Sequence, residues 1–523
     1  MNKIVLCTVA PVSQRTAEEN LGIGYLAETL RKNNYIVSII DAWLTPLTDD
    51  KIIELLHNEM PFFALGFSCY MTNIPRTISL MKRIKKLYPD VFYMCGGFGP
   101  TFNSEEFISA GFNIAMRGEG EATIVEVCNY LTTGEPTLNN ILGITYLDSS
   151  GKILGTNSRP LINDLDSLPM PSRETMRMAM KRKSYVNICT SRGCHGNCMF
   201  CSVIAFFRKS PGKHWRGRSV TSIVDEIELL YKGGVRYIKA VDDSFIDGDR
   251  DADWCRKLAD ELERRGINVI LRSAMRADKV TDEILYHLKR AGFISFSVGI
   301  ENGSPSALKR MNKLASLDIN IKALQLFKKH GLYMQAGFIL FDIDTTYQEL
   351  FENYQFLKKY DWMITKGIFS EMFAAEGTAY TNKLAKNNNL KYGNTIFDNS
   401  HYEIKDIAVR KVHFGFKIWH KSHIVLYDMA VEPLTSPKTI DMKYFEKFYD
   451  LQYRLKNYDI DFFGDLLILI ESKKEYGYEE IENYVTERIQ NMRSVYHELM
   501  QEVQKLYEDC NLIYDADKNP FFE

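Results

Sequence analysis

The sequence predicts an α/β protein in three parts: a parallel-sheet domain, a second α/β repeat and a helical C-terminal region. Strand-like apolar runs alternate with amphipathic helical segments twice along the chain, and the alternation stops near residue 380. The 523 residues are 45% hydrophobic and 25% charged. This length and composition are typical of a globular chain with several domains. We expect domains over residues 1–140, 181–380 and 381–523, with a connector over residues 141–180.

The first 130 residues alternate strand and helix. Strands are expected at residues 3–9, 36–40, 63–68 and 91–95, and helices at residues 21–31 and about 76–87. Buried strands separated by amphipathic helices predict a Rossmann-like parallel sheet that is covered on both faces. Ligands of such sheets bind at the carboxyl ends of the strands. Those ends fall at residues 11–14, 68–73, 96–101 and 118–121.

A connector with strands near residues 144–147 and 152–154 leads to the second α/β repeat. Its strand candidates are residues 186–189, 237–241, 269–271, 294–300, 334–341 and 367–372. Helices are expected between them, for example at residues 281–290 and 317–330. This repetition predicts a parallel α/β barrel, and counting strands does not separate a partial barrel from a full one.

The C-terminal region is predicted to be helical and rich in Tyr, Phe and Lys. Residues 481–506 place apolar side chains at steps of three and four, which is one apolar stripe on a long amphipathic helix. The stripe favours packing against the same chain, and a dimer seam is the alternative.

Charge and hydropathy exclude several classes of protein. The formal net charge of -2 argues against a surface built to bind nucleic-acid backbone. No apolar run approaches the roughly 18 residues of a membrane span. The N-terminal residues fit a first strand better than a signal peptide, so we expect a cytoplasmic protein. Ten cysteines are too sparse for a disulfide scaffold, and the scattered ones read as small buried hydrophobic residues.

Three cysteines are clustered with the spacing CxxxCxxC, directly after the first strand candidate of the second repeat. Thiolates are the usual ligands of iron–sulfur clusters, and three from one loop leave one iron of a 4Fe–4S cube open. Zinc is the alternative, but a structural zinc site normally takes four ligands from two separated pairs. His195 lies inside the loop, where a closed tetrahedron is awkward. The spacing therefore indicates a 4Fe–4S cluster held by Cys194, Cys198 and Cys201.

With this loop after the first strand of an α/β barrel, the sequence resembles the radical S-adenosylmethionine (SAM) enzymes. Other segments match that family in the same order: Asp242-Asp243-Ser244-Phe245 after the second strand, Arg276 after the third, and the GIE.GS motif that contains Glu301 after the fourth. The resemblance implies a radical SAM barrel over residues 181–380. It also implies that SAM chelates the open iron and that Asp242, Asp243, Arg276 and Glu301 orient SAM.

The N-terminal part is similar to the cobalamin-binding domain that is fused to many radical SAM enzymes. The matching stretches are residues 21–27, 66–70, 95–98 and 117–121. The resemblance implies that these and neighbouring loops face cobalamin, through Ser68, Tyr70, Thr72, Gly96, Gly97, Phe98, Glu119 and Gly120. The chain lacks the Asp-x-His-x-x-Gly motif of classical cobalamin modules, so we expect no protein histidine on cobalt.

The combined resemblance implies a cobalamin-dependent radical SAM enzyme. The commonest reaction of such enzymes is C-methylation of an unactivated carbon, through a 5′-deoxyadenosyl radical and methylcobalamin. Ring contraction, cyclisation or another rearrangement without methyl transfer is the alternative on the same cofactors. A non-catalytic iron–sulfur protein or cobalamin carrier is a second alternative. The expected partners are a small-molecule or peptide substrate and an electron donor such as flavodoxin or ferredoxin.

Overall fold

The chain divides into two compact units. The computed structural model describes residues 2–10, 19–45, 47–181, 183–365, 367–391, 401–435 and 442–512. The first unit comprises mainly Met1–His195 and Ser202–Asp243, and the second comprises Gly196–Cys201, Ser244–Tyr392 and Asn399–Glu523. The boundary between the units passes through the cysteine loop and the second α/β repeat. This division into two units does not test the predicted domain limits, which therefore remain a prediction.

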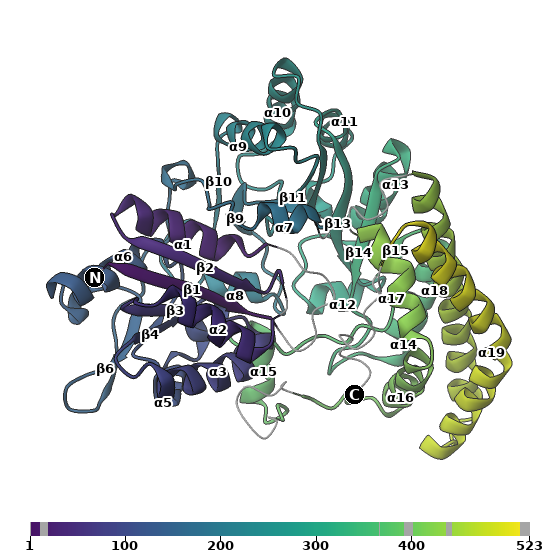
Figure 1. Ribbon diagram of the computed structural model, residues 1–523. Coiled ribbons are helices and arrows are strands. Elements are labelled where there is room, and N and C mark those ends of the chain that lie inside the picture. The colour runs from purple at the N-terminus through teal and green to yellow at the C-terminus, as the bar shows by residue number, and fades with distance from the viewer. Residues whose placement is uncertain are drawn as a thin grey trace. The chain divides into compact units, whose positions relative to one another are not determined.

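A seven-stranded sheet forms the centre of the N-terminal part (Figure 1). Its order is β2-β1-β3-β4-β5-β6-β7, with the first five strands parallel and the last two antiparallel. The strands are β1 Lys3–Val9, β2 Ile36–Ala42, β3 Ala64–Ser68, β4 Phe92–Gly96, β5 Ile114–Met116, β6 Ile144–Leu147 and β7 Ile153–Gly155. The predicted Rossmann-like sheet is confirmed, and the strands expected in the connector extend it as β6 and β7.

Helices cover both faces of this sheet because its strands are apolar on both sides. Ile4 and Leu6 of β1 pack with α1 and α6, whereas Val5 and Cys7 pack with α2, α3 and α5 (Figure 1). This alternation follows the period of two of a β-strand. The helices are α1 Leu21–Lys32, α2 Asp49–Glu59, α3 Ile74–Leu87, α4 Phe98–Phe102, α5 Ser104–Ala110 and α6 Glu121–Thr133, with 3₁₀ turns at Met71–Asn73, Leu138–Asn140 and Leu165–Ser167.

The second α/β repeat begins in the first unit. After α7 (Met176–Lys181), strand β8 (Val186–Ile188) pairs in parallel with β11 (Tyr237–Ala240). In the sequence between these two strands, β9 (Ser191–Gly193) and β10 (Trp215–Gly217) form a separate antiparallel pair. Helices α8 (Ser202–Phe207) and α9 (Val220–Lys232) complete this segment.

The repeat continues in the second unit with parallel strands. They are β12 Ile270–Arg276, β13 Phe293–Glu301, β14 Tyr333–Phe338 and β15 Ile364–Thr365. Their helices are α10 Ala252–Arg264, α11 Asp282–Arg290, α12 Pro305–Arg310, α13 Leu317–His330, α14 Tyr347–Lys359 and α15 Ala379–Lys386, with a 3₁₀ turn at Ala277–Lys279. The predicted α/β repeat is confirmed, but the strand expected at residues 367–372 is wrong. Gly367 has a φ of 119°, which ends the extended run, and beyond it Glu371 forms an isolated bridge with Phe341.

The C-terminal region is helical, as predicted. It contains α16 Ile407–Lys421, α17 Ile424–Val431, a 3₁₀ turn at Glu432–Thr435, α18 Met442–Ser472 and α19 Tyr478–Asp509. The apolar stripe of α19 packs against α16, α17 and α18 of the same chain (Figure 1). Among the described helices, none is both long enough and apolar enough to cross a membrane.

A lysine is buried inside this helical region. Lys456 of α18 is 1% exposed, and its Nζ donates to the carbonyl oxygen of Met363. Burial lowers the pKa of Lys456 to about 7, because the charged ammonium loses its hydration, and the more distant Asp361 only partly opposes this. The folded protein therefore holds this lysine neutral in a pH range where the unfolded chain holds it charged.

We expect the buried Lys456 to make the free energy of unfolding increase from about pH 7 to about pH 10, by up to about 1.4 kcal/mol per pH unit. The reason is that in this range the unfolded state binds up to one more proton than the folded state, so raising the pH favours the folded state. The variant Lys456→Met should gain stability relative to the wild type as the pH falls towards 7. Urea unfolding at pH 7, 8 and 9 measures this, with the exposed Lys447→Met on the same helix as the control. Parallel pH profiles for wild type and Lys456→Met would contradict it.

Candidate functional site

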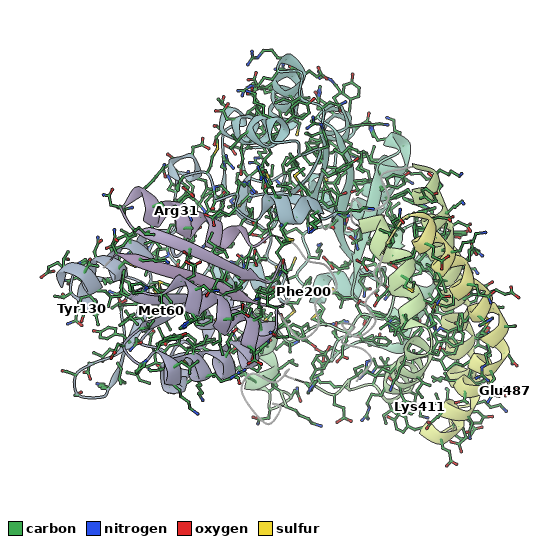
Figure 2. All side chains as sticks on the ribbon, in the orientation of Figure 1. Arg31, Met60, Tyr130, Phe200, Lys411 and Glu487 are labelled. Atoms are coloured by element: carbon green, nitrogen blue, oxygen red, sulfur yellow. The ribbon has the colours of Figure 1, made fainter. Side chains whose placement is uncertain are left out.

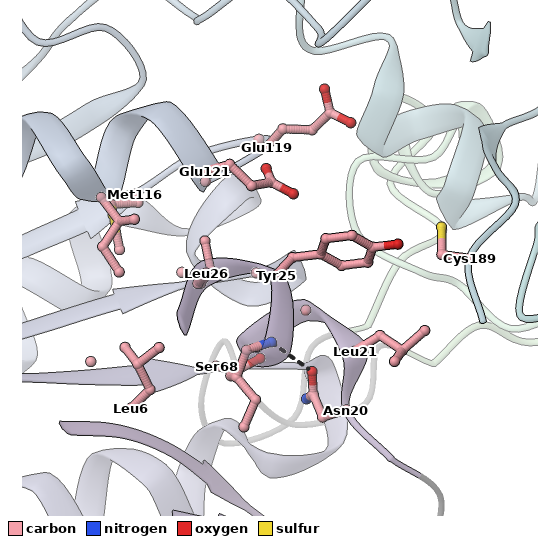
Figure 3. A pocket seen from close by; sticks show the side chains of 18 of the residues that line it. Leu6, Asn20, Leu21, Tyr25, Leu26, Ser68, Met116, Glu119, Glu121 and Cys189 are labelled. Carbon is pink, nitrogen blue, oxygen red and sulfur yellow. Dashed lines mark hydrogen bonds between the residues drawn. The ribbon is translucent and has the colours of Figure 1, made fainter. Parts of the chain in front are cut away.

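A cavity of about 510 Å³ lies at the carboxyl ends of the parallel strands of the first sheet. Its walls are mostly apolar side chains and glycines, including Leu6, Leu26, Phe67, Met116, Ile124 and Phe206. Figure 3 shows Leu6, Leu26 and Met116 around it, with the ring of Tyr25 pointing towards Cys189. Apolar walls with a few polar groups are typical of a site for a large organic ligand.

A second cavity of about 280 Å³ adjoins the first and shares Asn20, Trp43, Ser68 and Gly97 with it. Its wall is aromatic, because the ring of Tyr70 lies 5.7 Å from that of Phe98 and 6.5 Å from that of Trp43. The sequence-predicted residues that line one or both cavities are Ser68, Tyr70, Gly96, Gly97, Phe98, Glu119 and Gly120. The structure therefore brings together most of the residues predicted to face cobalamin.

Thr72 is the exception among these residues, since it lines neither cavity. It lies in the exposed part of the 3₁₀ turn after β3. The neighbouring Asn73 is buried instead: its side chain accepts from Tyr70 N at 2.8 Å and donates to Val9 O at 2.8 Å. Asn73 therefore holds the turn, and Thr72 is left facing outwards. Residues 11–14, predicted at the end of the first strand, lie outside the described residues.

The lining of the two cavities contains no histidine among the described residues. It is instead completed by residues from the start of the second α/β repeat. Cys189, Arg192, Phe206, Phe207 and Val241 all face the 510 Å³ cavity, and all belong to the same compact unit as the sheet. Anything bound in this cavity therefore borders both the sheet and the segment that leads into the cysteine loop.

Three polar residues of the cavity wall, Glu119, Glu121 and Arg192, form a buried network with Arg216, which is not itself part of the lining. Arg216 Nη1 donates to both carboxylate oxygens of Glu119, at 3.0 and 2.8 Å, and Arg192 Nη1 donates to Glu119 Oε1 at 2.9 Å. Arg192 Nη2 donates to Glu121 Oε1 at 2.5 Å. Burial by itself would raise the pKa of Glu121, but Arg192 lowers it below its usual range. Glu119 lines the cavity, yet its carboxylate is already occupied by the arginines.

This network joins two distant segments of the chain. Arg192 and Arg216 face each other across the antiparallel pair β9–β10, and Glu119 and Glu121 follow β5 of the sheet. The side chains of Arg216 and Glu119 are 2% and 5% exposed, so solvent screens this pair little. The network therefore fixes the β9–β10 pair, and with it Gly193 and Cys194, to the segment that follows the carboxyl end of β5.

The backbone before Cys194 is tightly packed. Gly193 has a φ of 86°, and a Cβ at this position would lie 1.7 Å from His214 O. Only glycine fits there. Asp243 Oδ2 accepts from Gly193 N at 3.0 Å. Asp242 accepts from Thr190 N and from Ser191 Oγ, both at 2.7 Å.

The two aspartates predicted to orient SAM therefore support the strand that carries Cys194. Asp242 is 4% exposed and is engaged by this backbone. Many protein atoms surround Asp243, but part of its surface is exposed to solvent. Desolvation raises the pKa of Asp243 to about 6, assisted by the charge of Asp242 and opposed by the bond from Gly193 N.

The rest of the cysteine loop belongs to the second unit. Cys201 N donates to Cys198 O at 3.2 Å, so the loop turns back on itself. Met199 N donates to Met311 O at 3.0 Å and Met199 O accepts from Tyr380 N at 2.8 Å. Phe200, labelled in Figure 2, packs with Met199 against an apolar cluster that includes Met311 and Tyr380. These contacts anchor the loop to α12 and α15.

Cys198 has the other predicted residues of this unit as neighbours. The charges of Lys313, Glu301 and Arg276 all act on its thiol, whose pKa is raised by burial. Lys313 Nζ lies 3.0 Å from Glu301 Oε1, and Arg276 pairs with Asp278 at 2.5 Å. Glu301 has a φ of 66°, which is rare for a residue that is not glycine and is typical of functional strand ends.

Several residues of the site were not predicted. Arg192 directly precedes the cysteine loop, and that position is the one signal that the sequence offered for it. Arg216 and Lys313 carry no motif, and Tyr25 lies in the matching stretch 21–27 but was not selected as a site residue. Among the described residues, no three His, Cys, Asp or Glu side chains are gathered tightly enough to hold a metal ion. The ligand role of the three cysteines therefore rests on their spacing and on the comparisons below.

Comparison with known proteins identifies two family models in the chain. The B12 binding domain matches residues 12–128, and the radical SAM superfamily matches residues 188–357. The chain is 30% identical over 348 residues to an uncharacterized methyltransferase of Pyrococcus horikoshii, which covers 65% of this chain and 73% of that protein.

Two further similarities extend this comparison. The chain is 28% identical over 379 residues to the anaerobic magnesium-protoporphyrin IX monomethyl ester cyclase of Rubrivivax gelatinosus, covering 68% of this chain and 66% of that protein. Its fold is similar to that of OxsB, a cobalamin-dependent S-adenosylmethionine radical enzyme solved with aqua-cobalamin and S-adenosylmethionine bound. The TM-score is 0.77 at 20% identity, over 99% of this chain and 82% of that chain.

The buried pair of Glu119 and Arg216 yields a stability prediction. We expect Glu119→Leu to lower the free energy of unfolding by about 3–5 kcal/mol, because it leaves the buried Arg216 without its acidic partner. Arg216→Met should lower it by less, about 1–3 kcal/mol, because Arg192 still donates to Glu119. The double variant should lose much less than the sum, since it removes both charges. Chemical denaturation of the wild type and the three variants measures this coupling. The exposed pair Arg83–Asp50 of the same unit, with side chains 47% and 84% exposed, serves as the control with an expected coupling below about 1 kcal/mol. Additive losses at Glu119 and Arg216 would contradict the network.

Proposed function

Because the chain belongs to the cobalamin-dependent radical SAM enzymes, we propose that it is a C-methyltransferase that acts on an unactivated carbon of a small-molecule or peptide substrate. When bound, the 4Fe–4S cluster and SAM supply a 5′-deoxyadenosyl radical, and cobalamin supplies a transferable methyl group. The protein itself holds these groups, orients them and excludes water.

One observation carries this proposal. The 510 Å³ cavity is lined jointly by the segment that matches the B12 binding domain and by the segment that matches the radical SAM superfamily. Arg192, which lines the cavity, is two residues before Cys194. A methyl donor in this cavity would therefore border the loop that holds the radical-generating cluster. A simple cobalamin carrier has no need of such a shared wall.

The described residues fit cobalamin. The two adjoining cavities offer apolar and aromatic walls and backbone surfaces at Gly96 and Gly97, which suit a flat macrocycle. No histidine is present in their described lining, in agreement with the missing Asp-x-His-x-x-Gly motif. We assign Ser68, Tyr70 and Phe98 to the surface that faces the macrocycle. Thr72 has no part in this assignment.

The described residues also fit the cluster and SAM. Cys194, Cys198 and Cys201 are half-buried and in no disulfide, and we assign them as the three ligands of a 4Fe–4S cluster. The charges of Arg276 and Glu301 act on the Cys198 thiol, which supports their assignment to the SAM site. We assign Asp242 and Asp243 to holding the strand before Cys194, and Asp243 keeps an exposed face with which to meet SAM.

A rearrangement without methyl transfer is the second candidate. The similarity to a magnesium-protoporphyrin IX monomethyl ester cyclase, at 28% identity, favours it. The similarity to a protein named a methyltransferase, at 30% identity over 73% of that protein, favours methylation. For either reaction we propose a cytoplasmic enzyme that takes its electrons from a carrier such as flavodoxin or ferredoxin. The ten cysteines without disulfides support a reducing compartment.

The cluster assignment predicts a loss of iron. Anaerobically reconstituted wild type should bind one 4Fe–4S cluster, and a variant with Cys194, Cys198 and Cys201 all changed to Ala should not, because it lacks every thiolate ligand. Iron and sulfide analysis with visible absorbance measures this. Cys510→Ala removes a half-buried thiol elsewhere and should keep the full cluster. Full iron and sulfide in the triple variant, or a wild type that binds only zinc, would overturn the proposed function.

The choice between methylation and rearrangement predicts a product balance. Methyl transfer consumes SAM in two ways, so methylated product, S-adenosylhomocysteine and 5′-deoxyadenosine should appear in equal amounts. Rearrangement would form 5′-deoxyadenosine without S-adenosylhomocysteine. Quantitative mass spectrometry of turnover with candidate substrates and with SAM labelled in its methyl group measures the balance. A product that carries no label would reject methyl transfer and leave the second candidate.

A further inference from the structure

A smaller cavity of about 170 Å³ lies beside the 510 Å³ cavity, in the same unit, and Gly118 lines both. Its wall differs from that of its neighbour. It carries basic and hydroxyl side chains, namely Arg117, Lys209, Thr101, Ser104, Ser158 and Ser210. Its described lining contains no acidic residue. A wall of hydrogen-bond donors and positive charge is suited to an anion.

The positive charge of this cavity is uncompensated. Arg117 Nη2 donates to the backbone carbonyl oxygens of Ile144, at 3.0 Å, and of Thr156, while its Nε is buried without a hydrogen-bond partner. Lys209 Nζ lies 5.3 Å from the ring centre of Phe102. In the part of the chain that the structure describes, neither cation forms an ion pair. Burial lowers the pKa of Arg117, because no carboxylate offsets its desolvation.

The two arginines that pair with the acids of the larger cavity show the contrast. Arg192 and Arg216 sit on the carboxylates of Glu119 and Glu121, so their charge is balanced within the protein. A half-buried arginine without an acid is costly unless an anion completes it. Among the described residues, the chain therefore provides no negative partner for Arg117 or for the nearby Lys209.

Hydroxyl groups complete the site. Thr101 Oγ1 accepts from Gly118 N at 3.0 Å and donates to Gly97 O at 2.7 Å, and Ser104 Oγ accepts from Thr145 Oγ1 at 2.9 Å. Among the described residues, the hydroxyls of Ser158 and Ser210 make no hydrogen bond within the protein. A Cβ at Gly118 would lie 3.1 Å from Ser210 Oγ, so that hydroxyl stands at the junction of the two cavities. Two unengaged hydroxyls and two cations thus line one small space.

We propose that this cavity binds a phosphate group, and that its source is the phosphodiester in the nucleotide tail of cobalamin. Guanidinium, ammonium and hydroxyl donors together match the geometry and charge of phosphate oxygens. The shared residue Gly118 places the site next to the cavity assigned to the macrocycle. In this arrangement the apolar walls hold the macrocycle and the base of the nucleotide tail. The polar cavity holds the charged phosphate that lies between them. The inference rests on the proposed cobalamin site.

The test compares cobalamin with cobinamide, which lacks the nucleotide and its phosphate. Dissociation constants are measured by equilibrium dialysis on the full-length protein, for wild type, Lys209→Gln and Arg117→Met. Lys209→Gln is the main variant, because Lys209 is exposed and supports no backbone group, whereas Arg117 also ties β5 to β6. Lys213→Gln is the matched control, since Lys213 is exposed in the same segment and lines none of these cavities.

We expect Lys209→Gln to bind cobalamin about three- to tenfold more weakly, and Arg117→Met at least tenfold more weakly, with cobinamide unchanged. Lys213→Gln should bind both ligands like the wild type. Equal weakening for cobalamin and cobinamide would overturn the proposal, because it would mean a structural effect. A wild type that binds no cobalamin would instead reject the proposed function.

Calorimetry with inorganic phosphate separates the two sources of a phosphate group. If cobalamin affinity is unchanged in Lys209→Gln, but inorganic phosphate binds the wild type and not the variant, the site belongs to a phosphorylated substrate. That result supports the phosphate site and overturns its assignment to cobalamin. If neither cobalamin affinity nor phosphate binding depends on Lys209 or Arg117, the phosphate site itself is rejected.

Discussion

The Glu119 carboxylate is the interaction on which the site depends. It receives Arg192 and Arg216 from the two strands of the antiparallel pair β9–β10, and it follows β5 of the first sheet. With side chains only 2% and 5% exposed in its closest pair, the contact is strong and expensive to break. It holds Arg192 of β9 in the wall of the 510 Å³ cavity. Because Cys194 directly follows β9, the same contact sets where the cysteine loop begins.

A second constraint acts on the same pair of strands from its other side. Gly193 packs so closely against His214 that no side chain can replace its hydrogen, and its N–H is held by Asp243. Asp242 holds Thr190 and Ser191 in the same way. The acids that follow β11 thus hold the backbone and hydroxyl groups of residues 190–193, and the acids that follow β5 hold the arginine side chains. Together they leave the strand before Cys194 little freedom, which is what a rigid cofactor site requires.

Charge is distributed unevenly around the cofactor cavities, and the pattern separates structural from binding roles. Arg173 and Arg218 meet Glu226, and Arg192 and Arg216 meet Glu119 and Glu121, so these buried cations serve the fold. Arg117 and Lys209 meet no acid among the described residues and line a space of about 170 Å³. The rule applies in the C-terminal helices as well, where Lys456 lacks a direct acidic partner and its pKa falls to about 7. A buried cation either finds an anion or loses its proton.

The sequence by itself determined the alternation of strands and helices, the cysteine spacing and the loops that line the cavities, because these depend on periodicity and on neighbours along the chain. Ser68, Tyr70, Gly97 and Glu119, which it selected, line the cavities in the structure. It misplaced the last strand of the repeat, since the turn of Gly367 leaves no periodic signal. Thr72, which it also selected, lines neither cavity. Only the tertiary structure decided that Glu119 meets Arg216, 97 residues away, and that Arg117 and Lys209 line one cavity whose described lining has no acid. Such pairings depend on which strand ends share an edge, and the balance of buried charge exists only once the chain has folded.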